Sequence, residues 1–91
     1  MKYKVVPQKK FMKGLKRCVK RGLDENLLWD VVYKLANGQR LEPKYNDHKL
    51  HGNYKDCREC HIEPDWLLIY KIENDKLVLT LTNTGTHSDL Y

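Results

Sequence analysis

The feature that most constrains the fold is a pair of apolar segments separated by a short polar turn near the C-terminus. Residues 66–72, WLLIYKI, are mostly apolar and rich in branched and aromatic side chains, as in a buried strand. Residues 77–82 alternate leucine with valine or threonine, which is the period-two pattern of a second strand with one leucine face. Residues 73–75, END, predict the hairpin turn between them.

A hairpin brings its two outer ends together, and both ends carry ionisable side chains. His61 and Asp65 lie just before the first strand, and His87 lies just after the second. We therefore expect these three side chains at one end of the sheet. Imidazoles and a carboxylate in one place can exchange protons near neutral pH, so this end of the sheet is a candidate catalytic edge.

The first half of the chain predicts a short strand over residues 3–6 and two helices. Pro7 favours the start of the first helix and Gly22 its end, whereas Asp24 is a suitable N-cap for the second and Asn37-Gly38 a suitable stop. At helical spacing, the apolar stripes comprise Phe11, Leu15, Cys18 and Val19 in the first helix, and Leu27, Leu28, Val31, Val32 and Leu35 in the second.

The remaining segments complete a single domain of residues 1–91. Residues 39–53 are polar and contain a proline, which predicts an irregular loop, and residues 54–60 can form a strand. Pro64 then predicts a turn before Trp66. The order of strand, two helices and three strands predicts an α+β fold, with a three-stranded antiparallel meander packed on the helices.

Length and composition exclude several classes of protein. The chain has no stretch of roughly 18 apolar residues, so we expect no membrane span. Its first residues, MKYKVVPQKKF, contain no apolar signal core. Three cysteines, an odd number, argue against a disulfide framework and agree with a reducing compartment. We therefore expect a cytoplasmic protein.

Positive charge is concentrated at the N-terminus. The first 22 residues hold nine Lys or Arg and no acid, whereas the other 69 hold eight basic and twelve acidic residues. A solvated helix face is one interpretation. The other is a surface for RNA, DNA or an acidic partner, which the net charge of +5 also favours.

A zinc site is an alternative use of the polar residues. Cys57 and Cys60, with His48 and His51, supply four ligands of suitable types. However, a strand through residues 54–60 would direct the two cysteines to opposite faces. The same strand would place its start, and therefore His48, at the far end of the sheet from His61. We expect no bound metal and regard His51 as a surface residue.

Three ordered motifs in the C-terminal half resemble the YafQ branch of the RelE superfamily of bacterial toxins. The segments are NDHKLHGNY, then RECHIEPDW, then TGTHSDLY. The matching positions are Asp47, His48, Leu50, Gly52, Arg58, His61, Pro64, Asp65, Trp66, Gly85, Thr86, His87, Leu90 and Tyr91.

The resemblance implies the RelE-like fold and a toxin of a type II toxin–antitoxin pair. Such a toxin is a metal-independent endoribonuclease, an mRNA interferase, that acts on mRNA in the ribosome and needs no cofactor. Its partner is a cognate antitoxin, which we expect to be a small dimeric DNA-binding protein with an acidic tail. Only the toxin–antitoxin complex would bind operator DNA.

By position, the resemblance implies a catalytic set of four residues: His48, His61, Asp65 and His87. We expect Arg58, Lys55, Trp66 and Tyr91 to contact the RNA. The family often ends in Phe where this chain has Tyr91, so the added hydroxyl puts a purely apolar role in doubt. We expect Asp65 and His87 to be the acid–base pair, although the sequence leaves open which of the two is the acid and which the base. We expect His48, His61 and Arg58 to contact the phosphate.

Two other functions compete with the ribonuclease. A non-enzymatic toxin of the ParE type would share the fold but act by binding, and it would not need three imidazoles and an aspartate at matched positions. A small zinc protein is the third reading. Primer extension on a message, with and without chelator, separates all three.

Overall fold

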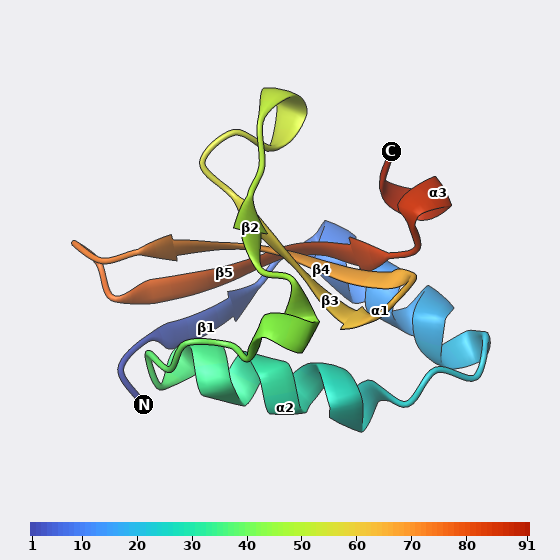
Figure 1. Cartoon of the computed structure of the whole chain (residues 1–91), viewed down its shortest axis with the longest axis horizontal. Coiled ribbons are helices and arrows are strands. Elements are labelled where there is room, and N and C mark those ends of the chain that lie inside the picture. The colour runs from blue at the N-terminus through green and yellow to red at the C-terminus, as the bar shows by residue number, and fades with distance from the viewer.

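The computed structural model describes all 91 residues, which form a five-stranded mixed sheet with two helices packed on one face (Figure 1). The strands lie in the order β1-β5-β4-β3-β2, and β1 is parallel to β5 while the other pairs are antiparallel. No helix is both long and apolar enough to cross a membrane. The elements are β1 (Lys4–Pro7), α1 (Lys9–Lys20), α2 (Glu25–Ala36), η1 (Pro43–Tyr45), β2 (His48–Lys49), η2 (Gly52–Tyr54), β3 (Arg58–Glu63), β4 (Trp66–Glu73), β5 (Val78–Gly85) and α3 (His87–Leu90).

The two helices follow the predicted stripes except at two residues, and the first helix begins later than predicted. Helix α1 begins at Lys9 rather than at Pro7, because Pro7 still pairs with β5 at the end of β1. Asp24 caps α2 as predicted, accepting a hydrogen bond from the backbone N–H of Asn26 at 3.0 Å. Val19 and Leu27 were predicted to be buried but are 40% and 41% exposed, since each lies at the edge of its apolar stripe.

Gly14 allows α1 to pack unusually close to the sheet. A Cβ atom at this position would lie 2.3 Å from the backbone oxygen of Thr84 in β5. Phe11, Leu15 and Cys18, on the same face of α1, are buried in the main core. The stripe pattern did not reveal this role, because glycine contributes no apolar side chain to the periodicity.

The predicted hairpin is present as β4 and β5. Leu79 and Leu81 are completely buried, and five successive β4 residues, from Trp66 to Tyr70, are buried as well. Leu77, predicted to belong to the leucine face, is instead 50% exposed at φ +53° in the turn. The strand begins one residue later, at Val78, because the turn extends through Leu77.

The segment before the hairpin differs most from the prediction. The strand expected over residues 54–60 runs from Arg58 to Glu63, so His61 lies within it. The expected loop at residues 39–53 contains η1 and the two-residue strand β2, which pairs with β3 at His48 and Glu59. The loop therefore folds back along β3, and this pairing changes the position of His48.

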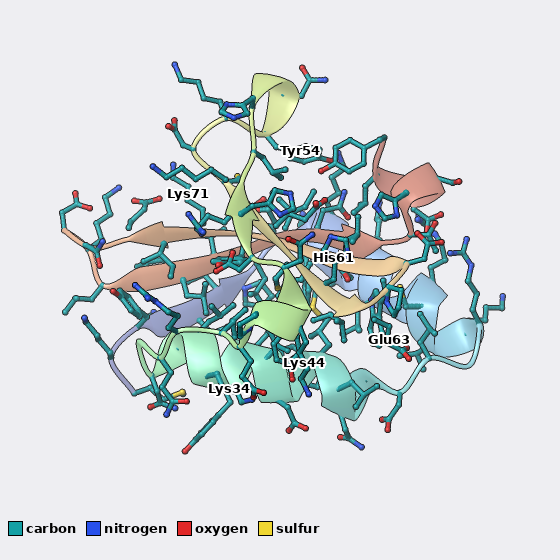
Figure 2. All side chains as sticks on the ribbon, viewed as in Figure 1. Lys34, Lys44, Tyr54, His61, Glu63 and Lys71 are labelled. Carbon is teal, nitrogen blue, oxygen red and sulfur yellow. The ribbon has the colours of Figure 1, made fainter.

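The sheet has one covered face and one largely open face. Cys60 on β3 and Tyr70 on β4 belong to the main core under α1 and α2. The opposite face holds a small cluster of Leu67, Ile69 and Leu90. Tyr54, which is labelled in Figure 2, packs against this cluster. Strand alternation places Glu59 and His61 on this second face, so the functional side chains lie away from the helices.

Candidate active site

Asp65 and His87 form the closest pair of ionisable groups at the hairpin end. Asp65 lies in the turn before β4, and His87 is the first residue of α3, directly beyond β5. Leu67 pairs with Gly85, so the two strands bring both residues to the same edge. The Oδ1 atom of Asp65 lies 2.6 Å from Nδ1 of His87 and accepts a hydrogen bond from its backbone N–H at 3.0 Å.

These contacts determine the charge of Asp65 and the tautomer of His87. The backbone N–H of His87, and after it the His87 ring, lower the pKa of the Asp65 carboxyl below its usual value. The carboxylate is therefore ionised at neutral pH and holds the proton of His87 on Nδ1. The Nε2 atom of His87 has no partner in the protein and is available to a substrate.

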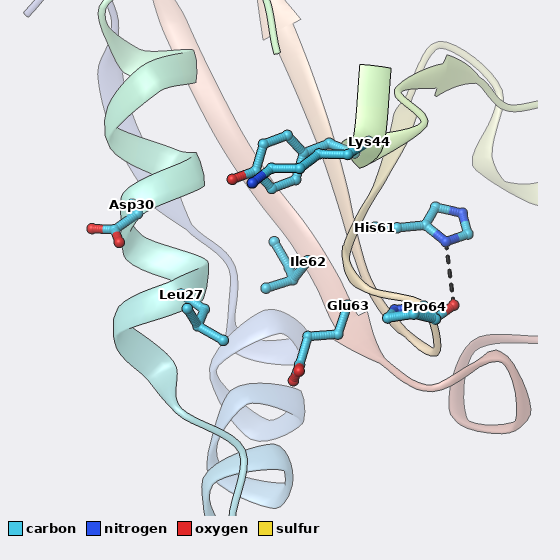
Figure 3. Close-up of a pocket in the computed structure, with 8 residues that line it drawn as sticks. Leu27, Asp30, Lys44, His61, Ile62, Glu63 and Pro64 are labelled. Carbon is cyan, nitrogen blue, oxygen red and sulfur yellow. Dashed lines mark hydrogen bonds between the residues drawn. The ribbon is translucent and has the colours of Figure 1, made fainter. Parts of the chain in front are cut away.

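His61 lies opposite His87. The two ring centroids are 5.8 Å apart, and the rings meet edge to face. The Nδ1 atom of His61 lies 3.3 Å from the backbone oxygen of Pro64, as Figure 3 shows. With Nδ1 donating to that carbonyl, Nε2 carries the lone pair, at 3.5 Å from the side-chain amide of Asn46. His61 and His87 thus present two imidazoles across a narrow gap.

His48, His61 and His87 form a row of three rings, the imidazole row. The place of His48 in this row is contrary to the expectation from strand direction. Its ring centroid lies 6.2 Å from that of His61, because β2 folds back and pairs with β3. The Nδ1 atom of His48 lies 2.8 Å from the backbone oxygen of Asn46, and Nε2 lies 3.0 Å from a carboxylate oxygen of Glu59. The family motif, and not the expected strand geometry, therefore gave the correct location of His48.

Glu59 is the residue of this site that the sequence analysis missed. It is 5% exposed, and its Oε2 atom contacts His48 at 3.0 Å and faces His61 at 3.9 Å. The hydroxyl of Tyr91 donates to its other carboxylate oxygen at 2.7 Å, and burial, followed by this bond, raises the pKa of Tyr91. Glu59 and His61 are two apart on one strand, so correct strand bounds would have placed them on the same face.

Of the four residues expected to contact RNA, Tyr91 lies at the site and two do not. Trp66 is only 1% exposed, and its indole N–H donates to Thr84 at 3.0 Å, so it offers no free ring face. Arg58 lies on the strand face opposite His61, where its Nε donates to Asp47 at 3.1 Å. Neither Trp66 nor Arg58 therefore faces the imidazoles in this structure, and contact of either residue with RNA stays a prediction. Lys55 is exposed at the end of η2.

A pocket of about 580 Å³ adjoins the site on the helix side of β3 (Figure 3). Leu27 of α2 and Ile62 of β3 face each other across it, with Lys44 above them and Glu63 beside Pro64. The His61 ring points away from this space, toward Pro64. His61 nevertheless lines part of the pocket, whereas His48 and His87 do not, so the pocket borders the site only through His61.

One group of side chains could hold a metal ion. Ligand atoms of His48, Glu59 and His61 all lie within 4.8 Å of one another. The alternative set with two cysteines is not assembled: Cys60 is buried in the main core, whereas Cys57 packs against the cluster on the other face. His51 is exposed at the start of η2 and belongs to no such group.

Comparison with known proteins identifies the family. The family of bacterial toxins of the type II toxin–antitoxin system, YafQ, matches residues 3–91. The mRNA interferase toxin YafQ of Escherichia coli strain K12 is 43% identical over 82 residues, which cover 89% of this chain and 87% of that protein.

Two solved structures show the same fold. The metal-bound toxin from Helicobacter pylori is 48% identical, with a TM-score of 0.91 over 98% of this chain and 99% of that one. The toxin in the E. coli DinJ-YafQ complex is 36% identical, with a TM-score of 0.89 over 98% of each chain. The family match over nearly the whole chain, the sequence identity and the shared fold agree with one another, and the chain belongs to the YafQ family of bacterial type II toxins.

Proposed function

We propose that this protein is an mRNA interferase that cleaves mRNA at the ribosome in the cytoplasm, without a metal ion. The observation that carries the proposal is the Asp65–His87 pair facing His61, with ring centroids 5.8 Å apart. Cleavage of RNA through its own 2′-hydroxyl needs a base for that hydroxyl, a cation near the phosphorane and an acid for the leaving 5′-oxygen. Imidazoles can fill all three roles near neutral pH.

The contacts of each ring suggest how the roles are divided. The ionised Asp65 accepts the Nδ1 proton of His87, so a doubly protonated His87 can donate its other proton from Nε2 to the 5′-oxygen. His61 donates from Nδ1 to Pro64, so its Nε2 lone pair is suited to accept the 2′-hydroxyl proton. This proposal departs from the expected acid–base pair of Asp65 and His87, because Asp65 orients His87 and His61 takes the role of the base.

His48 is suited to provide charge near the phosphate. Both of its ring nitrogens face oxygen acceptors, the backbone of Asn46 and the carboxylate of Glu59. With both nitrogens protonated, His48 donates to both oxygens and carries a positive charge beside His61. In this arrangement Glu59 positions His48 and does not contact the RNA.

Single-turnover cleavage of a defined message tests the assignment. Because each change removes a general acid or base, His87→Ala and His61→Ala should each slow cleavage by roughly 10²- to 10⁴-fold. His51→Ala is the matched control, since His51 is exposed and outside the site. Circular dichroism checks folding. Near-normal cleavage by folded His87→Ala, or an equally large loss in His51→Ala, would show that the catalytic edge is misplaced.

The same proposal includes an antitoxin. The family is defined by type II toxin–antitoxin systems, and the similar E. coli toxin is found in a complex with DinJ. A chain of net charge +5 is complementary to an acidic antitoxin tail, and the complex would bind operator DNA. We expect a neighbouring gene for a small protein with a dimeric DNA-binding region and an acidic tail. Harmless overexpression of this chain alone, with no co-transcribed partner, would contradict the toxin function.

A non-enzymatic ParE-type toxin is the competing function, and the site argues against it. A binding surface does not need a carboxylate that fixes the tautomer of one imidazole opposite a second imidazole. Primer extension after induction distinguishes the two: an interferase gives discrete new 5′ ends in the message, and a purely binding toxin gives none.

A second proposal concerns metal, because three side chains are suitably placed and a similar H. pylori toxin is metal-bound. Two imidazoles and a carboxylate suit Zn²⁺ or Cu²⁺. An ion held by His48, Glu59 and His61 would occupy the Nε2 lone pair that His61 needs, so it would inhibit cleavage. Adding zinc to chelator-treated protein should therefore slow cleavage, and chelator alone should not. Loss of activity in chelator, restored by zinc, would overturn the metal-independent mechanism.

A further inference from the structure

The helix that carries His87 cannot hold its own position. Helix α3 spans only His87–Leu90, and a single turn is unstable without outside contacts. Leu90 anchors one side by packing on Leu67 and Ile69. The other side is anchored by Asp89, whose contacts reach the far end of the chain.

Asp89 binds an arginine from α1 and the backbone at the start of α3. Arg21 donates to both of its carboxylate oxygens, at 2.6 and 3.1 Å, and Arg17 lies at 3.6 Å. The backbone N–H of Thr86 donates to Asp89 at 2.9 Å, while the Thr86 hydroxyl accepts from the backbone N–H of Asp89. The Arg21 guanidinium, and after it Thr86, hold the pKa of Asp89 well below its usual value. Asp89 is therefore a fixed anion.

Gly85 makes room for this carboxylate. A Cβ atom at Gly85 would lie 2.8 Å from Cβ of Asp89 and 2.9 Å from its Oδ2. Any larger residue would push Asp89 away from Thr86 and loosen the turn into α3. The Gly85-Thr86-His87 motif thus has a structural meaning beyond its histidine.

Two successive backbone N–H groups are bound by two carboxylates. The N–H of Thr86 is bound by Asp89, and the N–H of His87 is bound by Asp65. The peptide that carries the His87 ring is therefore held from both sides, by one aspartate at the site and one tied to α1.

We propose that Asp89, held in place by Arg21, is a positioning residue that sets the His87 ring against Asp65. This inference rests on the proposed ribonuclease function. Arg21 and Asp89 contact no part of the imidazole row, so their effect on His87 comes through the placement of α3, beside a weaker Coulombic effect of Asp89 on Asp65. Arg21 belongs to the basic N-terminal segment. On this proposal the segment supports the catalytic edge, in addition to any role in attracting RNA.

The test compares Arg21→Gln, Asp89→Asn and the double variant with Arg40→Gln. Arg40 is an exposed arginine with no ion pair, so its variant controls for the loss of one surface charge. A displacement of about 1 Å at a catalytic group can cost up to roughly 10²-fold in rate. We expect Arg21→Gln and Asp89→Asn each to slow single-turnover cleavage by about 10-fold or more. The double variant should be no slower than the slower single variant, because both changes break one contact.

Two further measurements separate positioning from general structural damage. Binding of an RNA with a 2′-O-methyl group at the scissile site should stay within about 2-fold of wild type. The NMR signal of the His87 Nδ1 proton, which reports its hydrogen bond to Asp65, should move in Arg21→Gln and Asp89→Asn but not in Arg40→Gln. Thermal unfolding identifies any variant that fails to fold, and in that case the milder Arg21→Lys replaces Arg21→Gln.

The outcomes distinguish this inference from the proposed function. If wild type and Arg21→Gln cleave equally fast, or if the signal of the His87 Nδ1 proton is the same in both, the positioning role is wrong while the ribonuclease function stands. If the slower cleavage is matched by weaker RNA binding, Arg21 is an RNA contact and the positioning role is also wrong. If wild type itself cleaves no message, the proposed function fails.

Discussion

Replacing Gly14 with alanine tests the close packing of α1 on the strand that leads into the site. The new Cβ atom would lie 2.3 Å from the backbone oxygen of Thr84, and ordinary contacts begin near 3.4 Å. The helix must therefore retreat by about 1 Å, which is the difference between these distances. Overpacking of this kind costs about 1–3 kcal/mol. Alanine recovers about 1 kcal/mol through its higher helix propensity.

The net destabilisation should therefore be about 0–2 kcal/mol, which corresponds to a fall in Tm of up to roughly 16 °C for a domain of this size. Cleavage should also slow, because Thr84 bonds to Trp66 and Leu67 beside the start of β4. Calorimetry or thermal circular dichroism measures the change. Lys10→Ala, at an exposed position of the same helix, is the control and should shift the stability by no more than about 0.5 kcal/mol. A Tm for Gly14→Ala above that of wild type would refute the packing argument.

Three further predictions follow from charges and hydrogen bonds. The pKa values of Asp65 and Asp89 are lowered in the folded state. The contribution of these two carboxylates to the free energy of unfolding is therefore present above the usual carboxyl pKa and is lost as pH falls. Thermal unfolding below about pH 4 should show this loss, and Asp89→Asn should show less of it. Tyr91→Phe removes a hydrogen bond to Glu59 and should change single-turnover cleavage by less than about 10-fold, since that bond contributes roughly 1 kcal/mol. Replacing four lysines of α1 with Gln should weaken RNA binding and flatten its salt dependence; the positions are Lys9, Lys13, Lys16 and Lys20. An unchanged salt slope would show that these lysines form only a solvated helix face.

Local patterns in the sequence were sufficient for much of the fold. The hairpin was predicted from alternation in residues 77–82 and the apolar run at 66–72, and both strands are present. The cap at Asp24 and the stop at Asn37-Gly38 depend on neighbours within one helical turn. Since a hairpin joins its own ends, the meeting of Asp65 with His87 also followed from local order along the chain.

Other features depended on contacts between distant segments. His48 reaches His61 only because β2 pairs with β3, and no local signal in residues 39–53 predicts that pairing. Glu59 was missed because the bounds of β3 were displaced, and the face of a side chain reverses with each residue of register. The burial of Trp66 and the tie between Arg21 and Asp89 likewise depend on packing across the sheet. Short-range propensity determined which elements form, whereas pairing and packing free energies, summed over segments far apart in the chain, decided which side chains meet.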